Sequence, residues 1–83
     1  MFKIRLTQKA RKELQQISRA HQLAIGRILE DLQDNPHEGK ALTRELTGRF
    51  SYRVGIYRII YKVQEKDKII YILTAGHRSR VYQ

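Results

Sequence analysis

Three short stretches of the chain decide the fold: F-S-Y-R-V (residues 50–54), I-Y-R-I-I-Y-K-V-Q (56–64) and K-I-I-Y-I-L-T-A (68–75). β-branched and aromatic residues dominate all three, and apolar residues recur at every second position, so each predicts a strand. The turn at 65–67 joins the last two as a hairpin, whereas Gly55 is interpreted as a bulge or kink. Both alternating sets of 68–75 are apolar, which predicts a central strand.

The segment before these strands predicts one further strand and two helices. Apolar residues alternate with charged and polar ones over 2–7, as in a half-buried strand. A first helix is expected from Thr7, a plausible N-cap, to about Arg19, and a second from about His21 until Asn35-Pro36 ends it. The predicted fold class is therefore α+β, a single domain over 1–83 in the order β-α-α-β-β-β, with a helical hairpin packed on an antiparallel-rich twisted sheet.

Composition narrows the class of protein. The 83 residues fit one domain, and the absence of cysteine rules out a disulfide framework and a cysteine zinc site. No stretch approaches the length of a membrane span, and the alternating start M-F-K-I-R-L-T is unlike a signal peptide. We therefore expect a cytoplasmic protein.

The charge is strongly positive and unevenly distributed. The formal net charge is +9, and residues 47–83 hold eight Lys or Arg against two acids. Arginine offers bidentate hydrogen bonds to phosphate and tyrosine a face for base stacking, and the two interleave here, so the expected partner is a nucleic acid. The alternatives are a basic hairpin with aromatic core residues and an acidic protein partner.

Several chemistries have no support in the sequence. It lacks a glycine-rich phosphate loop, a His-x-x-x-His pair and a pair of carboxylates spaced for metal binding, so we expect neither a metal nor a cofactor. Metal-free RNA cleavage needs only in-line attack by a 2′-hydroxyl, charge stabilisation on the phosphate and movement of two protons. Arg53, Arg58 and Arg78 suit the charge role, and His77 suits proton transfer. Arg58 lies among apolar neighbours, so the floor of a groove is expected for it rather than a dry core.

An ordered set of motifs resembles a known family. Y-R-V-G-I-Y-R-I-I-Y-K-V (52–63), an apolar strand and A-G-H-R-S-R-V-Y (75–82) follow an L-x-G at Leu46 and Gly48. Over nearly the whole chain, this order resembles the RelE branch of the RelE/ParE toxin superfamily. The resemblance implies the toxin of a type II toxin–antitoxin pair, an endoribonuclease (mRNA interferase) that cleaves mRNA on the ribosome and inhibits translation.

The resemblance also implies individual roles. Arg58 matches the strand arginine that steadies the scissile phosphate, Arg78 the arginine that supports the transition state or leaving group, and Tyr82 the tyrosine that stacks on the substrate base. Some members carry two lysines near Arg53, one of them proposed as the general base, and this chain lacks both. His77 is therefore the candidate to take the proton instead. The candidate RNA-binding residues are Arg49, Lys62 and Arg80.

The resemblance leaves two other functions open. A ParE-like protein on the same fold would inhibit DNA gyrase without catalysis, and the missing lysine pair would also fit a binding module without toxicity. In each toxin reading the implied partner is a cognate antitoxin; the nuclease reading adds the ribosome and mRNA, and none requires a membrane or a small-molecule cofactor.

Overall fold

A computed structural model describes residues 1–77. Arg78, Arg80 and Tyr82, three of the predicted site residues, lie outside the described residues. The elements in chain order are β1 (Lys3–Leu6), α1 (Gln8–Gln15), α2 (Arg19–Asp34), β2 (Lys40–Ala41), a 3-10 turn η1 (Arg44–Leu46), β3 (Arg49–Val54), β4 (Tyr57–Gln64) and β5 (Ile69–His77).

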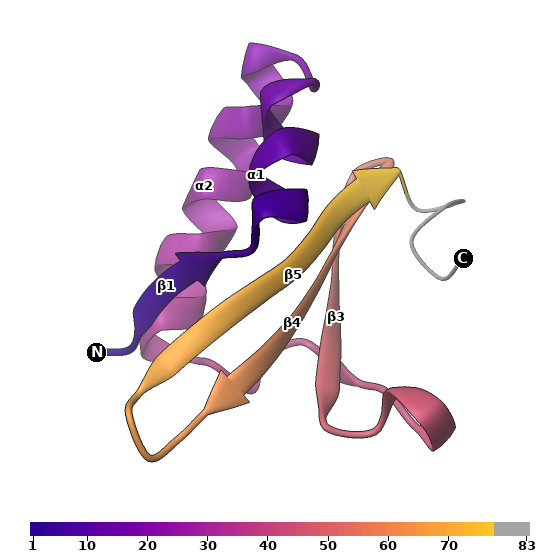
Figure 1. Ribbon diagram of the computed structural model, residues 1–83. Coiled ribbons are helices and arrows are strands. Elements are labelled where there is room, and N and C mark those ends of the chain that lie inside the picture. Colours follow the sequence, from indigo (N-terminus) through magenta and orange to yellow (C-terminus); the bar gives the residue numbers. More distant parts are fainter. Residues whose placement is uncertain (78–83) are drawn as a thin grey trace.

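The strands form one mixed sheet. Their order is β1-β5-β4-β3-β2, with β1 parallel to β5 and the other neighbours antiparallel. The helices lie together against one face of this sheet (Figure 1), as the burial of their apolar stripes indicates. The predicted α+β class and helical hairpin are confirmed, and β5 lies between two strands, as its two apolar faces predicted. The sequence did not indicate the short edge strand β2.

Local signals in the sequence explain both helices. The Thr7 hydroxyl accepts a hydrogen bond from the Ala10 N–H at 3.1 Å, which caps α1 as predicted. The first helix ends at Gln15, earlier than the expected Arg19, because Ser18 is the N-cap of the next helix. That helix begins at Arg19 and ends just before Asn35-Pro36, as the proline predicted.

The hydrophobic core lies between the helices and the sheet. Its fully buried large side chains come from α2, β4 and β5: Ile25, Leu32, Ile59, Tyr61, Ile70 and Ile72. Alternate residues of β1 and β3 pack against this cluster. Because side chains alternate along a strand, the remaining residues of β1, β3 and β4 point to the opposite face of the sheet.

The interpretation of Gly55 as a bulge or kink is wrong. Val54 is paired with Tyr57, so Gly55 and Ile56 form a two-residue hairpin loop between β3 and β4. Gly55 has a φ of +61°, which the twist-compatible two-residue turns require at their first position. The irregularity in pairing lies elsewhere, between Ile60 and Tyr61 on β4.

Within residues 1–77, neither helix is long and apolar enough to cross a membrane.

Candidate nucleic-acid interface

The sheet face opposite the helices is basic. The charged side chains at its strand positions are seven Lys and Arg: Lys3, Arg5, Lys40, Arg49, Arg53, Arg58 and Lys62. The five described strands contain no Asp or Glu at all; the acids lie on helices, loops and turns. A surface with a large excess of positive charge attracts a polyanion over a distance comparable to the Debye length.

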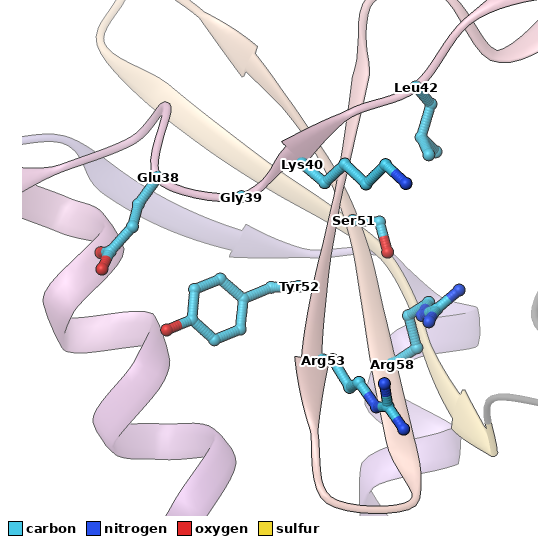
Figure 2. A pocket seen from close by; sticks show the side chains of 8 residues that line it. All are labelled: Glu38, Gly39, Lys40, Leu42, Ser51, Tyr52, Arg53 and Arg58. Atoms are coloured by element: carbon cyan, nitrogen blue, oxygen red, sulfur yellow. The ribbon is translucent and has the colours of Figure 1, made fainter.

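Two predicted arginines meet at one end of this face. Arg53 on β3 is directly opposite Arg58 on β4, next to the tight turn at Gly55. Figure 2 shows both side chains on the same side of the β3–β4 hairpin. They line a cavity of about 530 Å³ together with Ser51, Lys40 and residues of the preceding loop. Two guanidinium groups in register can contact separate oxygens of one phosphate group.

The environment of Arg58 agrees with the groove predicted for it. Its side chain is half-buried and lines the cavity, while the next two residues of β4, Ile59 and Ile60, are buried. Arg53 is exposed at the rim. A half-buried guanidinium interacts with an anion more strongly than one in bulk water does, because the local dielectric is lower.

One wall of the cavity is held in place by a buried tyrosine. The Gly39 N–H donates a hydrogen bond to the Tyr61 hydroxyl at 3.0 Å, which ties the 35–41 loop to β4. Burial raises the pKa of the Tyr61 hydroxyl above its ordinary value of 10.0, and the hydrogen bond from Gly39 opposes this shift. The phenol is therefore neutral near pH 7 and acts as a fixed structural contact.

His77 lies in a different cavity. It is paired in register with Tyr57, a residue of the helix-facing set, and both line a cavity of about 310 Å³ against α1. The His77 and Tyr57 ring centres are 6.3 Å apart. The residues that line the Arg53–Arg58 cavity include no histidine. Of the predicted catalytic residues within 1–77, the structure thus brings two arginines together and separates them from the histidine.

The predicted RNA-binding residues Arg49 and Lys62 are also directly opposite each other. Both are exposed and lie on the same sheet face as the arginine pair. The Lys62 ammonium lies over the Tyr71 ring, 5.6 Å from its centre. Tyr71 is half-buried, as expected of a tyrosine on a sheet surface.

Sequence reasoning missed Lys40 and the loop that carries it. The segment 35–49 has no clear periodicity, and β2 is only two residues long. Its register, Lys40 opposite Ser51, brings the ammonium to the cavity. Only the pairing of distant segments could reveal this position. Among residues 1–77, no group of three or more His, Asp or Glu could hold a metal ion.

Comparisons with known proteins agree with this fold. A family model described as the ParE toxin of the type II toxin–antitoxin system parDE matches residues 4–82. Toxin RelG of Mycobacterium tuberculosis is 33% identical over 84 residues, covering 99% of this chain and 97% of that protein.

Two solved structures extend the similarity to the backbone. The toxin–antitoxin complex RelBE2 of M. tuberculosis contains a chain that matches with a TM-score of 0.85 and 34% identity, covering 93% of this chain and 98% of that one. An archaeal RelE–RelB complex from Pyrococcus horikoshii gives a TM-score of 0.78 and 29% identity, with coverage of 96% and 98%. The family match spans nearly all of the chain, and the relatives are covered almost end to end. The chain therefore belongs to the ParE toxin family of type II toxin–antitoxin systems, within the RelE/ParE toxin superfamily.

Proposed function

We propose that this toxin is a ribosome-dependent endoribonuclease that cleaves mRNA by attack of a 2′-hydroxyl on the adjacent phosphorus. The observation that carries the proposal is the Arg53–Arg58 pair at a cavity on a sheet face whose strands hold no acid. Sequence identities of 33% and 34% to proteins named for the Rel systems support placing the chain in the RelE branch.

The arginine pair suits the charge that develops during such a reaction. As the 2′-oxygen approaches, negative charge builds on the non-bridging phosphate oxygens, and the P–O5′ bond then breaks to leave a 2′,3′-cyclic phosphate and a 5′-hydroxyl. Arg58, half-buried in the cavity, is the group we assign to those oxygens, and Arg53 is the second donor. Preorganised donors of this kind contribute on the order of 10²–10³-fold in rate.

Proton transfer needs a different group, because arginine does not deprotonate near neutral pH. His77 is the candidate for proton transfer from the sequence, but it lines the cavity on the helix side of the sheet. We therefore treat charge stabilisation and proton transfer as separate assignments. Arg78 and Tyr82, outside the described residues, keep their proposed roles in transition-state support and base stacking.

We further propose that the protein acts in the cytoplasm and is neutralised by a cognate antitoxin. The similar chains from M. tuberculosis and P. horikoshii come from toxin–antitoxin complexes. The basic sheet face has the charge to attract an acidic partner segment, which would compete with RNA for it. Co-expression with the product of the neighbouring reading frame should restore growth and yield a stable complex.

Primer extension on an mRNA in a purified translation reaction tests the nuclease directly. Codon-linked cuts that appear only when both ribosomes and the protein are present support the proposal. Cleavage of a bare oligonucleotide at catalytic protein concentrations would contradict ribosome dependence. A protein that is toxic yet produces no cuts would contradict the nuclease itself.

Inhibition of DNA gyrase is the second candidate, because the matching family model is that of the ParE toxins. A supercoiling assay with purified gyrase separates the two functions. Inhibited supercoiling without mRNA cleavage would replace the nuclease proposal, and loss of both activities in a stably folded protein would point to a binding module without toxicity.

A further inference from the structure

Four residues form a continuous row across the basic sheet face. Arg5 on β1 is opposite Tyr71 on β5, Tyr71 is opposite Lys62 on β4, and Lys62 is opposite Arg49 on β3. We call this set the cation row. Since adjacent strands lie about 4.8 Å apart, its three cationic positions span roughly 14 Å at right angles to the strands.

We propose that the cation row is a second RNA-binding site, which holds a stretch of phosphate backbone apart from the Arg53–Arg58 pair. The proposal rests on the proposed function in one respect, that the ligand is RNA. The cleavage chemistry does not require these residues. The row would instead hold the RNA at a point away from the scissile bond.

The side chains of the row are available to a ligand and partly oriented. Arg5, Lys62 and Arg49 are all exposed. The Lys62 ammonium, 5.6 Å from the centre of the Tyr71 ring, is directed along the row toward β5. Attraction between the ammonium and the ring favours this orientation before any ligand binds.

The row lowers the stability of the free protein, and a bound anionic ligand would offset that loss. Arg49 and Lys62 are like charges directly opposite each other on neighbouring strands, an arrangement that destabilises a sheet. The strands supply no carboxylate to compensate. Of the two acids in the adjacent β4–β5 turn, Glu65 already contacts the His37 Nε2 at 2.5 Å.

The row is separate from the Arg53–Arg58 pair along the same two strands. Lys62 is four residues after Arg58, and Arg49 is four residues before Arg53, so each step covers about 13 Å at the rise of a strand. The Lys62 side chain also points along the row and not toward the cavity. A ligand that engages both sets must therefore be extended and repeatedly charged, as an RNA backbone is.

Salt-dependent binding to an RNA that cannot be cut tests the row. The probe is a single-stranded RNA with 2′-O-methyl groups throughout, which lacks the attacking hydroxyl. The test variant, Arg5→Gln with Arg49→Gln and Lys62→Gln, removes three charges and keeps the side-chain stems. The matched control, Lys12→Gln with Arg19→Gln and Arg27→Gln, removes three charges from exposed helix positions.

For single strands the slope of log affinity against log salt is about −0.7 per phosphate contact, so losing three contacts should reduce its magnitude by about two. At 0.1 M salt the affinity of the row variant should fall roughly tenfold to a hundredfold, with a much smaller change in the control. Equal losses in both variants, or a row variant that binds with the wild-type slope, would overturn the proposal.

A second measurement uses the wild-type protein and so does not depend on how the variants fold. Bound RNA should protect Lys62 from acetylation while leaving Lys12 on α1 reactive. Equal reactivity of Lys62 with and without RNA would overturn the proposal. A row variant that keeps its RNA affinity but no longer binds antitoxin would replace it with a protein interface.

These outcomes are distinguishable from those that test the nuclease. If the wild-type protein makes no cuts in a translation reaction but the row variant loses binding to the uncleavable RNA, the nuclease proposal fails and the row stands. If the wild-type protein cuts mRNA and the row variant binds the uncleavable RNA normally, the row fails alone.

Discussion

The Thr74 hydroxyl on β5 lies 2.7 and 2.9 Å from the two carboxylate oxygens of Glu13 on α1. The Ala75 N–H donates a further hydrogen bond to the same carboxylate at 3.2 Å. Strand β1 ends at Leu6, opposite Ile72, so it cannot pair with the last residues of β5. The Glu13 side chain of α1 therefore takes the place of β1 beside the last residues of β5 and holds that end of the strand.

Thr74→Val should lower the free energy of unfolding by about 1–2 kcal/mol, because it leaves a half-buried carboxylate with one donor fewer at nearly constant shape. Urea unfolding followed by circular dichroism measures the change. Thr74→Ser keeps the hydroxyl and is the control, expected to retain most of the stability. Wild-type stability in the valine variant would mean that water replaces the contact without loss.

Arg58→Ala should reduce mRNA cleavage on programmed ribosomes by about 10²–10³-fold, since it removes a preorganised donor from the phosphate. Arg58→Lys should recover only part of the activity, because an ammonium lacks the bidentate fork. Arg27→Ala, on the exposed surface of α2, is the matched control for charge. Full cleavage by both Arg58→Ala and Arg53→Ala would remove the arginine pair from the site.

Gly39→Ala should destabilise the protein by about 1–3 kcal/mol and distort the wall of the arginine cavity. An added Cβ would lie 2.6 Å from the Tyr61 Oη and 2.9 Å from the Ser51 carbonyl oxygen. Gly26→Ala on α2 is the control, because its Cβ meets nothing within 4 Å and a helical alanine should stabilise slightly. Equal melting temperatures for the two variants would contradict the close approach at Gly39.

Tyr61→Phe should change both the stability and its dependence on alkaline pH. The folded-state pKa of Tyr61 is raised, so the neutral phenol favours folding below the unfolded pKa of about 10, and this contribution is lost as the pH rises through the folded pKa. The phenylalanine variant should be less stable by about 1–2 kcal/mol at pH 7, since the Gly39 N–H loses its acceptor.

Unfolding free energies measured between pH 8 and 11 should therefore fall less steeply for Tyr61→Phe than for the wild-type protein. The four other tyrosines are the same in both proteins, so their contributions cancel in the comparison. Parallel pH profiles would show that Tyr61 ionises as easily in the folded state as in the unfolded one.

Tyr82→Phe and Tyr82→Ala separate stacking from proton donation at a residue known here only from the sequence. If Tyr82 stacks on the substrate base, the phenylalanine variant should cleave at a near-normal rate and the alanine variant should lose activity, since stacking on an aromatic ring is worth about 1–3 kcal/mol per base. Equal losses in both variants would assign the function to the hydroxyl.

Most of the fold is determined by the sequence itself. Three local signals agree with the structure: the alternation along 56–64 and 68–75, the cap at Thr7, and the end of the helix at Asn35-Pro36. Each depends only on residues that are close in the chain. The excess of arginine and lysine in the strands likewise indicated an anionic partner without any coordinates.

Tertiary structure alone decided which of those residues meet. The alignment of Arg53 with Arg58, the row from Arg5 to Arg49 and the separation of His77 from the arginines all follow from strand register and sheet order. The contact of Glu13 with Thr74 joins residues that are 61 positions apart. Pairing between distant segments depends on how the whole core packs, so no local pattern specifies it.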